Sequence, residues 1–231
     1  SDVDTLNTRA SFDSNLVGGN NGLVDGVSYA SFEEINMGGG ADTATVNATV
    51  GKLNMGRGGD EATVSATVGE LNMGRGEDTA TLEEGAFGII NGGSNSDTLN
   101  TKEAFGSVLE GGTNGEVDGV RYTSFEEINM GGGADTATVN EAVNQLNMGA
   151  GVDKATVSAT VEQLNLEAGN DVATLQAGAS GQIDGGSDVD TLNTRASFDS
   201  NLVGGNNGLV DGVSYASFEE INMGGGADTA T

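Results

Sequence analysis

The chain repeats itself at several lengths, and the shortest repeat constrains its fold most. The segment MGRGGDEAT at 55–63 returns as MGRGEDTAT at 73–81, eighteen residues later. The segment DTLNT occurs at 4–8, 97–101 and 190–194, which gives a longer step of 93 residues. Short fixed periods of this kind are the signature of a solenoid, in which each repeat packs on the next.

An acid follows most of the glycine-rich segments, and its spacing indicates the length of one coil. The positions 42, 60, 78, 97, 116 and 135 are acidic and lie 18 or 19 residues apart. The sequence therefore predicts five coils in each 93-residue unit. We expect repeat units at 1–93 and 94–186 and a partial unit at 187–231 that is identical to 1–45, all within one continuous solenoid.

Each coil is predicted to consist of strands. In the segment ATVSATV at 62–68, small apolar residues alternate with Thr and Ser, and Leu71 and Met73 continue the alternation. A period of two is typical of a strand, whereas a helix would place these apolar residues on no common stripe. Gly74 and Gly76 then break the run, as a tight corner requires. The predicted fold is all-β, a parallel β-solenoid of the β-roll or β-helix type.

Stacked coils predict columns of like side chains. We expect Val46, Val64 and Leu82 to form one core column and Leu53 and Leu71 another. The methionines, which begin with Met37, Met55 and Met73, are expected to fill the core. Asn36, Asn54 and Asn72 are expected to form a ladder of side-chain amides along the axis.

Composition limits the partners of the chain. There are 35 acidic and 8 basic side chains, so the net charge of −27 excludes nucleic acid and anionic membrane surfaces as electrostatic partners and favours cations. The chain has no Cys or His, and therefore no disulfide framework or thiolate metal site. No apolar run approaches the length of a membrane span.

The glycine corners suggest a family. The segment GGSNSDTLN at 92–100 closely matches the nonapeptide GGxGxDxUx, with Asn95 in place of the third Gly, and MGRGGDEAT matches it with Met55 in place of the first. The chain here resembles the calcium-binding β-roll repeats of RTX toxins and adhesins. That resemblance implies that the corner Asp and loop carbonyls bind calcium between successive coils. The second half of each coil, such as VSATVGELN, lacks the motif, so one edge at most carries sites.

Repulsion between corner acids also favours a cation. Carboxylates about 4.8 Å apart repel by about 3 kcal/mol at an effective dielectric constant near 20, and a hard cation with oxygen ligands removes that cost. The alternative is that each Asp caps corner N–H groups and points into water. Glu116 and Leu23 fall where an Asp is expected and would interrupt the series. The candidate calcium ligands are Asp42, Asp60, Asp78, Asp97, Asp135, Asp153, Asp171, Asp190 and Asp228.

Two further patterns bear on enzymatic and ice-binding functions, namely pairs of adjacent acids and T-x-T segments. The adjacent acids that begin at Glu33, Glu126 and Glu219 recur with every unit, and we expect them to be solvated or to face a bend. No nucleophile has a His partner, so we expect no enzyme. The T-x-T segments, such as Thr43-Ala44-Thr45, are an array that ice-binding solenoids use, but Glu61 and Lys154 interrupt it.

The function expected from the sequence is therefore architectural. The chain is predicted to be a stalk or fibre in a large extracellular bacterial surface protein or adhesin, with copies of itself as partners in a filament or layer. The alternative is a calcium-responsive RTX-type binding or secretion module. An ice- or glycan-binding solenoid is the third and weaker possibility.

Overall fold

The structure is a computed structural model that describes residues 3–8, 12–101, 106–194 and 200–231. The chain forms two compact units. Unit 1 consists of Ser1–Lys102 and Gly119–Glu126, and unit 2 consists of Glu103–Asp118 and Glu127–Thr231. The division into repeats at 1–93, 94–186 and 187–231 stays a prediction. No helix in the described ranges is long and apolar enough to cross a membrane.

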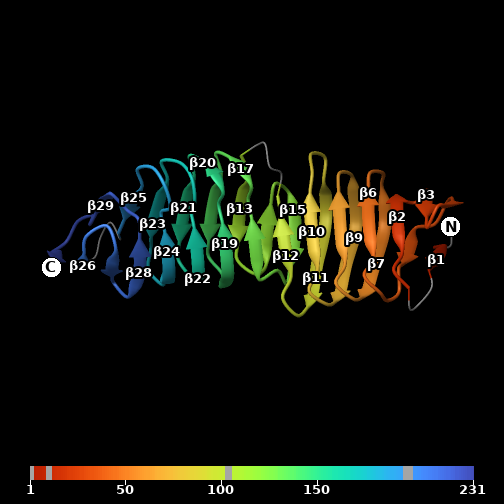
Figure 1. The fold of residues 1–231 in the computed structure, drawn as a ribbon, viewed down its shortest axis with the longest axis horizontal. Helices are drawn as coiled ribbons and strands as arrows, with labels where there is room; N and C mark the ends of the chain where they lie inside the picture. Colours follow the sequence, from red (N-terminus) through yellow and green to blue (C-terminus); the bar gives the residue numbers. More distant parts are fainter. Residues whose placement is uncertain (1–2, 9–11, 102–105, 195–199) are drawn as a thin grey trace. The chain divides into compact units, whose positions relative to one another are not determined.

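Unit 1 consists of two sheets whose strands alternate along the chain (Figure 1). The first sheet is parallel and contains β1 (Thr5–Asn7), β5 (Glu34–Asn36), β7 (Val50–Arg57), β9 (Thr67–Arg75), β11 (Phe87–Ser94) and β15 (Val120–Thr123). The second contains β4 (Val27–Tyr29), β3 (Gly22–Val24), β2 (Asn15–Gly18), β6 (Thr43–Val46), β8 (Glu61–Val64), β10 (Thr79–Leu82) and β12 (Thr98–Asn100).

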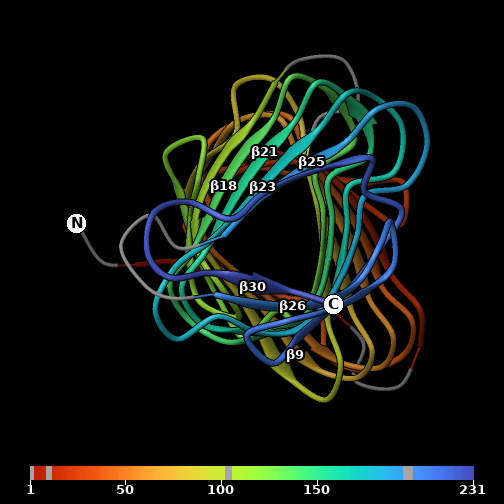
Figure 2. The same cartoon turned by 90° about the vertical axis from the view of Figure 1, so that its left-hand side faces the viewer.

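Unit 2 has the same construction. One sheet contains β14 (Gly115–Val117), β13 (Val108–Gly111), β18 (Thr136–Val139), β21 (Lys154–Val157), β23 (Val172–Leu175), β25 (Thr191–Asn193) and β29 (Glu220–Asn222). The other contains β16 (Glu127–Asn129), β19 (Val143–Asn147), β22 (Thr160–Asn165), β24 (Ser180–Asp184), β28 (Val213–Ala216), β27 (Gly208–Val210), β26 (Asn201–Gly204) and β30 (Thr229–Ala230). The short strands β17 (Gly132–Gly133) and β20 (Ala150–Gly151) pair at a corner. Figure 2 shows β18, β21, β23 and β25 side by side on one face of this unit.

The predicted all-β parallel solenoid is confirmed. In unit 1, Thr43 lies beside Glu61 and Glu61 beside Thr79, so neighbouring parallel strands are offset by 18 residues. The step from Thr79 to Thr98 is 19 residues. Each coil that keeps this period contributes one strand to each sheet. Residues along these strands alternate between buried and exposed or half-buried, because every second side chain points between the sheets.

The predicted core columns are also present in unit 1. Val46, Val64 and Leu82 lie beside one another in register, and all three are buried. Leu53 lies beside Leu71 and is equally buried. Like residues therefore stack on like residues, which lets every coil fill its interior in the same way. The buried methionines of this unit are Met37, Met55 and Met73.

One segment of the repeat departs from the short period. Strands β2, β3 and β4 form an antiparallel meander, and β26, β27 and β28 form the same meander in unit 2. The two-residue turn Asp25-Gly26 has φ of 50° and 77°, as a tight hairpin requires. The parallel neighbours across this segment are 28 or 29 residues apart, as in Leu16 with Ala44 and Thr5 with Glu34.

Candidate functional site

The corner aspartates point into the solenoid. The residues from Asp42 to Val46 alternate between buried and exposed, so the Asp side chain lies on the same inward face as Ala44 and Val46. Each side chain in the following set is at most 1% exposed: Asp42, Asp60, Asp78, Asp97, Asp135, Asp153, Asp171 and Asp190. Asp228 is half-buried. The alternative prediction is therefore wrong in one part, because these eight side chains do not point into water. Its other part is confirmed, because their carboxyl groups accept main-chain N–H groups at the corners.

Hydrogen bonds join the aspartates of unit 1 into a ladder. The Asp42 N–H donates to Asp60 Oδ1 at 2.8 Å, and the Asp60 N–H donates to Asp78 Oδ1 at 2.8 Å. The Asp78 N–H then donates to Asp97 Oδ1 at 2.9 Å. At the N-terminal end of this series, the Ser14 N–H donates to Asp42 Oδ1 at 2.6 Å. Each carboxyl group thus binds the main chain of the preceding coil, and we call this series the Asp ladder.

Unit 2 has its own Asp ladder. The N–H groups of Asp135 and Asp153 donate to Oδ1 of Asp153 and Asp171, both at 2.8 Å. The Asp171 N–H donates to Asp190 Oδ1 at 2.9 Å. The Ser107 N–H donates to Asp135 Oδ1, in the place that Ser14 takes in unit 1. The same pattern of bonds therefore recurs wherever the 18- to 19-residue period holds.

A glutamate takes the place of the next Asp where the meander interrupts the period. The Asp97 N–H donates to Glu126 Oε2 and the Asp190 N–H to Glu219 Oε2, both at 3.0 Å. The Asp4 N–H donates to Glu33 Oε2 at 3.1 Å. The spacing in the sequence predicts that the series reaches Glu116 and Leu23 and is interrupted there. Those residues lie in the antiparallel strands β14 and β3 instead, outside the ladder.

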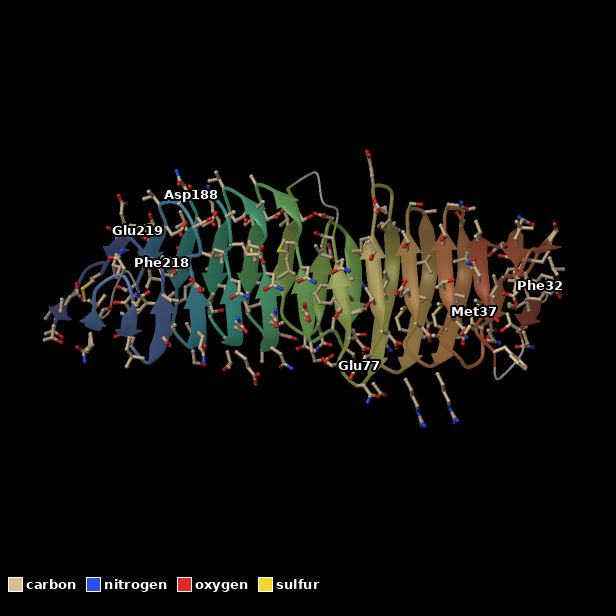
Figure 3. The ribbon with its side chains drawn as sticks, in the orientation of Figure 1. Phe32, Met37, Glu77, Asp188, Phe218 and Glu219 are labelled. Atoms are coloured by element: carbon tan, nitrogen blue, oxygen red, sulfur yellow. The ribbon has the colours of Figure 1, made fainter. Side chains whose placement is uncertain are left out.

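Aromatic packing holds this glutamate in place. Phe218 lies next to Glu219 (Figure 3) and is fully buried. It packs against Tyr215 with the ring centroids 6.4 Å apart. The Tyr215 hydroxyl donates to the Gly205 carbonyl oxygen at 2.9 Å. Ser217, which lies between Tyr215 and Phe218 in the sequence, has a φ of 57°. This arrangement anchors the segment before Glu219 to the meander and directs the glutamate toward Asp190.

The second carboxyl oxygen of every buried ladder aspartate has no partner. Oδ2 of each of the eight residues is buried and accepts no hydrogen bond. Burial raises the pKa of these carboxyl groups, while the bond to the main-chain N–H of the preceding coil opposes the rise. The pKa reaches about 6 in Asp60, Asp97, Asp135, Asp171 and Asp190. Close to neutral pH, each of these groups is a buried negative charge with only half of its oxygen atoms satisfied.

The glycine two residues before the Asp makes room for it. A Cβ on Gly76 would lie 3.0 Å from Asp78 Oδ1 and would overlap the carbonyl oxygen of Gly58 in the preceding coil. Gly76 has a φ of +152°, which side-chain-bearing residues rarely adopt. Close coil stacking therefore favours glycine at this position, although Asn95 (φ 94°) and Asp188 (φ 84°) occupy it before Asp97 and Asp190.

The ladder suits a hard cation in its chemistry. Unpartnered carboxylate oxygens and main-chain carbonyls are the donors that Ca²⁺ accepts in irregular loops. In the described part of the chain, no three Asp, Glu, His or Cys side chains gather closely enough to hold an ion by themselves. A bound cation would therefore combine the Oδ2 atoms of the ladder with corner carbonyls. The ladder residues stay candidate ligands.

The threonine array lies on the outer face of the second sheet of unit 1. Thr43, Glu61, Thr79 and Thr98 follow one another in register along it. Thr45, Thr63 and Thr81 form the neighbouring column, which Asn100 continues. The Thr face is thus present, and a charged Glu61 side chain interrupts it as the sequence predicts.

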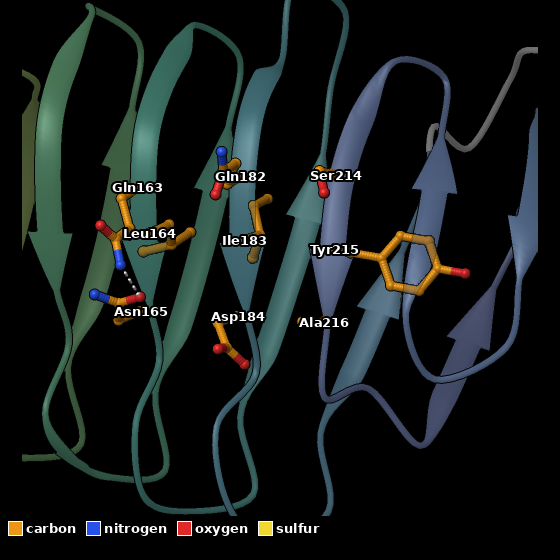
Figure 4. Close-up of a pocket in the computed structure, with 9 residues that line it drawn as sticks. All are labelled: Gln163, Leu164, Asn165, Gln182, Ile183, Asp184, Ser214, Tyr215 and Ala216. Carbon is orange, nitrogen blue, oxygen red and sulfur yellow. Dashed lines mark hydrogen bonds between the residues drawn. The ribbon is translucent and has the colours of Figure 1, made fainter.

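A small cavity lies on the sheet of unit 2 that contains β22, β24 and β28 (Figure 4). Its volume is about 100 Å³, below the ~300–1,000 Å³ of typical small-molecule sites. Gln163 Nε2 donates to Asn165 Oδ1 at 3.2 Å within it. The other polar residues that line it are Gln182, Asp184 and Ser214. Its size does not suit an enclosed substrate.

Comparison with known proteins adds little. No family model matches the chain, and no curated protein matches it. One similar solved structure is described as a hyperactive, Ca²⁺-dependent, beta-helical antifreeze protein from an Antarctic bacterium. The two chains are 20% identical and superpose with a TM-score of 0.37, over 99% of this chain and 72% of that one.

Proposed function

We propose that this chain is a structural repeat region, the stalk or fibre of a large extracellular bacterial surface protein or adhesin. The observation that carries the proposal is the in-register stacking of like coils within each unit. The main chain of each coil bonds to the preceding one at equivalent atoms, as in Glu61 N–H to Asp42 O and Thr79 N–H to Asp60 O, both at 2.9 Å. A fold of this kind extends by the addition of further repeats.

The same features fit a role outside the cell without catalysis. The net charge of −27 keeps the surface hydrated and separates it from anionic polymers. Copies of the chain are proposed as its partners, either end to end or side by side, in a filament or surface layer. The resemblance of the corners to RTX repeats supports the assignment to adhesins.

Immunogold labelling of intact cells that produce the protein, with an antibody against this chain, tests the proposal. We expect label outside the envelope without permeabilisation, together with release of the antigen by external protease. A cytoplasmic protein of the same cells serves as the control for leakage. Label that requires permeabilised cells would contradict the proposed location and role.

A second candidate function is favoured by the unpartnered Oδ2 atoms. We propose that the Asp ladder binds calcium and that the chain folds in response to it, as in a calcium-responsive RTX-type module. The ladder residues Asp42, Asp60, Asp78 and Asp97 would hold the ion in unit 1, and Asp135, Asp153, Asp171 and Asp190 would hold it in unit 2. Calcium would supply positive charge to carboxylates that have lost their hydration.

Isothermal titration calorimetry with calcium tests this second candidate. We expect saturable binding to several sites per chain, with release of protons at about pH 6 because the carboxyl groups must ionise. Asn substitution at Asp60 and Asp78 should reduce the number of sites, whereas Gln substitution at the exposed Glu61 should not. Equal binding by all three chains would reject the ladder as the calcium site.

The threonine columns give less support to ice binding, because Glu61 and Lys154 lie among them. Measurement of thermal hysteresis with the purified chain tests that third possibility directly.

A further inference from the structure

Two arginines lie next to each other on adjacent coils of unit 1. Arg57 at the end of β7 lies in register with Arg75 at the end of β9, so their Cα atoms are neighbours across the sheet. Parallel strands are separated by about 4.8 Å, which brings the two side chains within reach of one ligand. Both side chains are exposed. We call this pair the Arg dyad.

The Arg dyad lacks the partner that a like-charge pair needs. In the described part of unit 1, Lys52 pairs with Glu70 at 3.3 Å, and neither arginine forms an ion pair. The acid Glu77 is two residues beyond Arg75 and is also exposed. The chain carries 35 acids and only 8 basic residues. Among the described strand registers, two basic residues lie side by side only here, although an acid at either position would remove the repulsion.

The neighbours of the Arg dyad leave it accessible. The same column continues to Gly39 on one side of Arg57 and to Ser94 on the other side of Arg75. Both neighbours are small, so no bulky side chain covers the guanidinium groups along the axis. The remaining negative charge of the chain is screened beyond about 8 Å at physiological ionic strength.

Unit 2 provides a natural comparison. The positions 93 residues later are Ala150 and Ala168, which lie beside each other in the equivalent column between Gly132 and Ser187. The corner therefore forms equally well with alanine. The arginines of unit 1 are not required by the backbone, and stacking alone does not explain them.

We propose that the Arg dyad binds a doubly charged oxyanion group, either the free sulfate ion or a phosphate monoester. Each planar guanidinium donates two parallel hydrogen bonds to such a group, and two guanidiniums on adjacent coils match its two charges. The ligand is a single compact group, because a longer polyanion would meet the acidic surface around the dyad. The proposal does not rest on calcium binding by the Asp ladder or on the proposed stalk function.

Calorimetric titration of the full chain with sodium sulfate, at constant ionic strength against sodium chloride, tests the proposal. We expect one saturable sulfate site per chain. The variant R57Q/R75Q should bind at least ~10-fold more weakly, and R57K/R75K should bind several-fold more weakly because lysine lacks the planar fork. The variant A150R/A168R should acquire a second site in unit 2. The control K154Q should bind like the wild type.

Two results would overturn the proposal. One is sulfate binding no stronger than chloride binding in the wild-type chain. The other is unchanged affinity in R57Q/R75Q when circular dichroism shows that variant to be folded. A sugar phosphate, whose monoester carries about two negative charges near neutral pH, then distinguishes the sources of the group: competition with sulfate shows that the site accepts an esterified group, and the absence of competition shows that it takes the free anion. Either of these last two results supports the site.

Discussion

At the scale of single residues, the two oxygens of the ladder aspartates differ in their partners. Oδ1 of Asp60 accepts the Asp42 N–H, whereas Oδ2 has no partner. The sequence predicts which Asp residues form the series, because their spacing is regular. Their burial could also have been predicted, since Asp42 is in phase with Ala44 and Val46. The orphaned Oδ2 could not, because it depends on how closely the glycine corners pack.

Proton binding to the Asp ladder predicts that the fold is more stable at mildly acidic pH than at neutral pH. The pKa of Asp60 and Asp97 is raised by burial to about 6 from an ordinary value of 3.8. The folded chain therefore binds more protons than the unfolded chain between about pH 4 and pH 6, and this stabilisation is lost as the pH rises through about 6. In chelator, we expect the urea midpoint to be higher at about pH 5 than at about pH 7.5.

Tyrosine fluorescence provides the measurement, since the chain has three Tyr residues and no Trp. The variant D60N/D78N should show a smaller change between the two pH values. A midpoint that rises toward neutral pH would show that the ladder carboxyl groups are not the dominant titrating groups.

Glu219 accepts a hydrogen bond from the Asp190 N–H, whereas its neighbour Glu220 does not. Replacement of Glu219 by Ala removes the acceptor of the Asp190 N–H, and we expect a loss of about 1–2 kcal/mol in the free energy of unfolding. The matched variant E220A should change it by less than about 0.5 kcal/mol, because the Glu220 side chain is exposed like that of Glu219 but accepts no hydrogen bond from the described residues. Hydrogen exchange of the Asp190 amide should accelerate in E219A alone. Equal exchange rates in both variants would exclude Glu219 from the ladder.

At the scale of elements, the coils were easier to predict than the meanders. Alternation in 62–68 predicts β8 and the start of β9 because one face of each strand is buried. The meander was not predicted, although VDGV at 24–27, 117–120 and 210–213 contains the Asp-Gly pair that favours a two-residue hairpin turn. The meander was concealed because a step of 19 residues also carries the acid series through Glu116 and the equivalent Leu23, as a regular coil would. The role of Glu33, Glu126 and Glu219 was missed for the same reason.

The glycine corners predict that the free energy of unfolding falls steeply when a side chain is introduced at them. Gly58 has a φ of +135°, and a Cβ there would overlap the carbonyl oxygen of Gly40. We expect G58V to lower the free energy of unfolding by more than about 3 kcal/mol. The control G205A should be tolerated, because a Cβ at Gly205 meets nothing within 4 Å. Urea unfolding checks both variants, and similar midpoints would show that the corners adapt to a side chain.

At the scale of the whole molecule, charge is the main cost that the fold must offset. Of the 35 acids, eight are buried in the Asp ladders, where each lies one coil from the next. Neutral ladders, whether protonated or bound to cations, would leave hydrophobic columns and coil-to-coil hydrogen bonds to stabilise the solenoid. Ionised ladders without cations would oppose the same stacking.

The thermal midpoint by circular dichroism, at about pH 7.5 in chelator and in excess calcium, tests this account most directly. The comparison is between the wild-type chain and a chain with Asn at all eight buried ladder positions, which keeps the Oδ1 acceptor and removes the charge. The account predicts that calcium raises the wild-type midpoint and that the Asn chain is already stable in chelator and insensitive to calcium. A wild-type chain equally stable in both solutions, with an Asn chain no more stable in chelator, would contradict it.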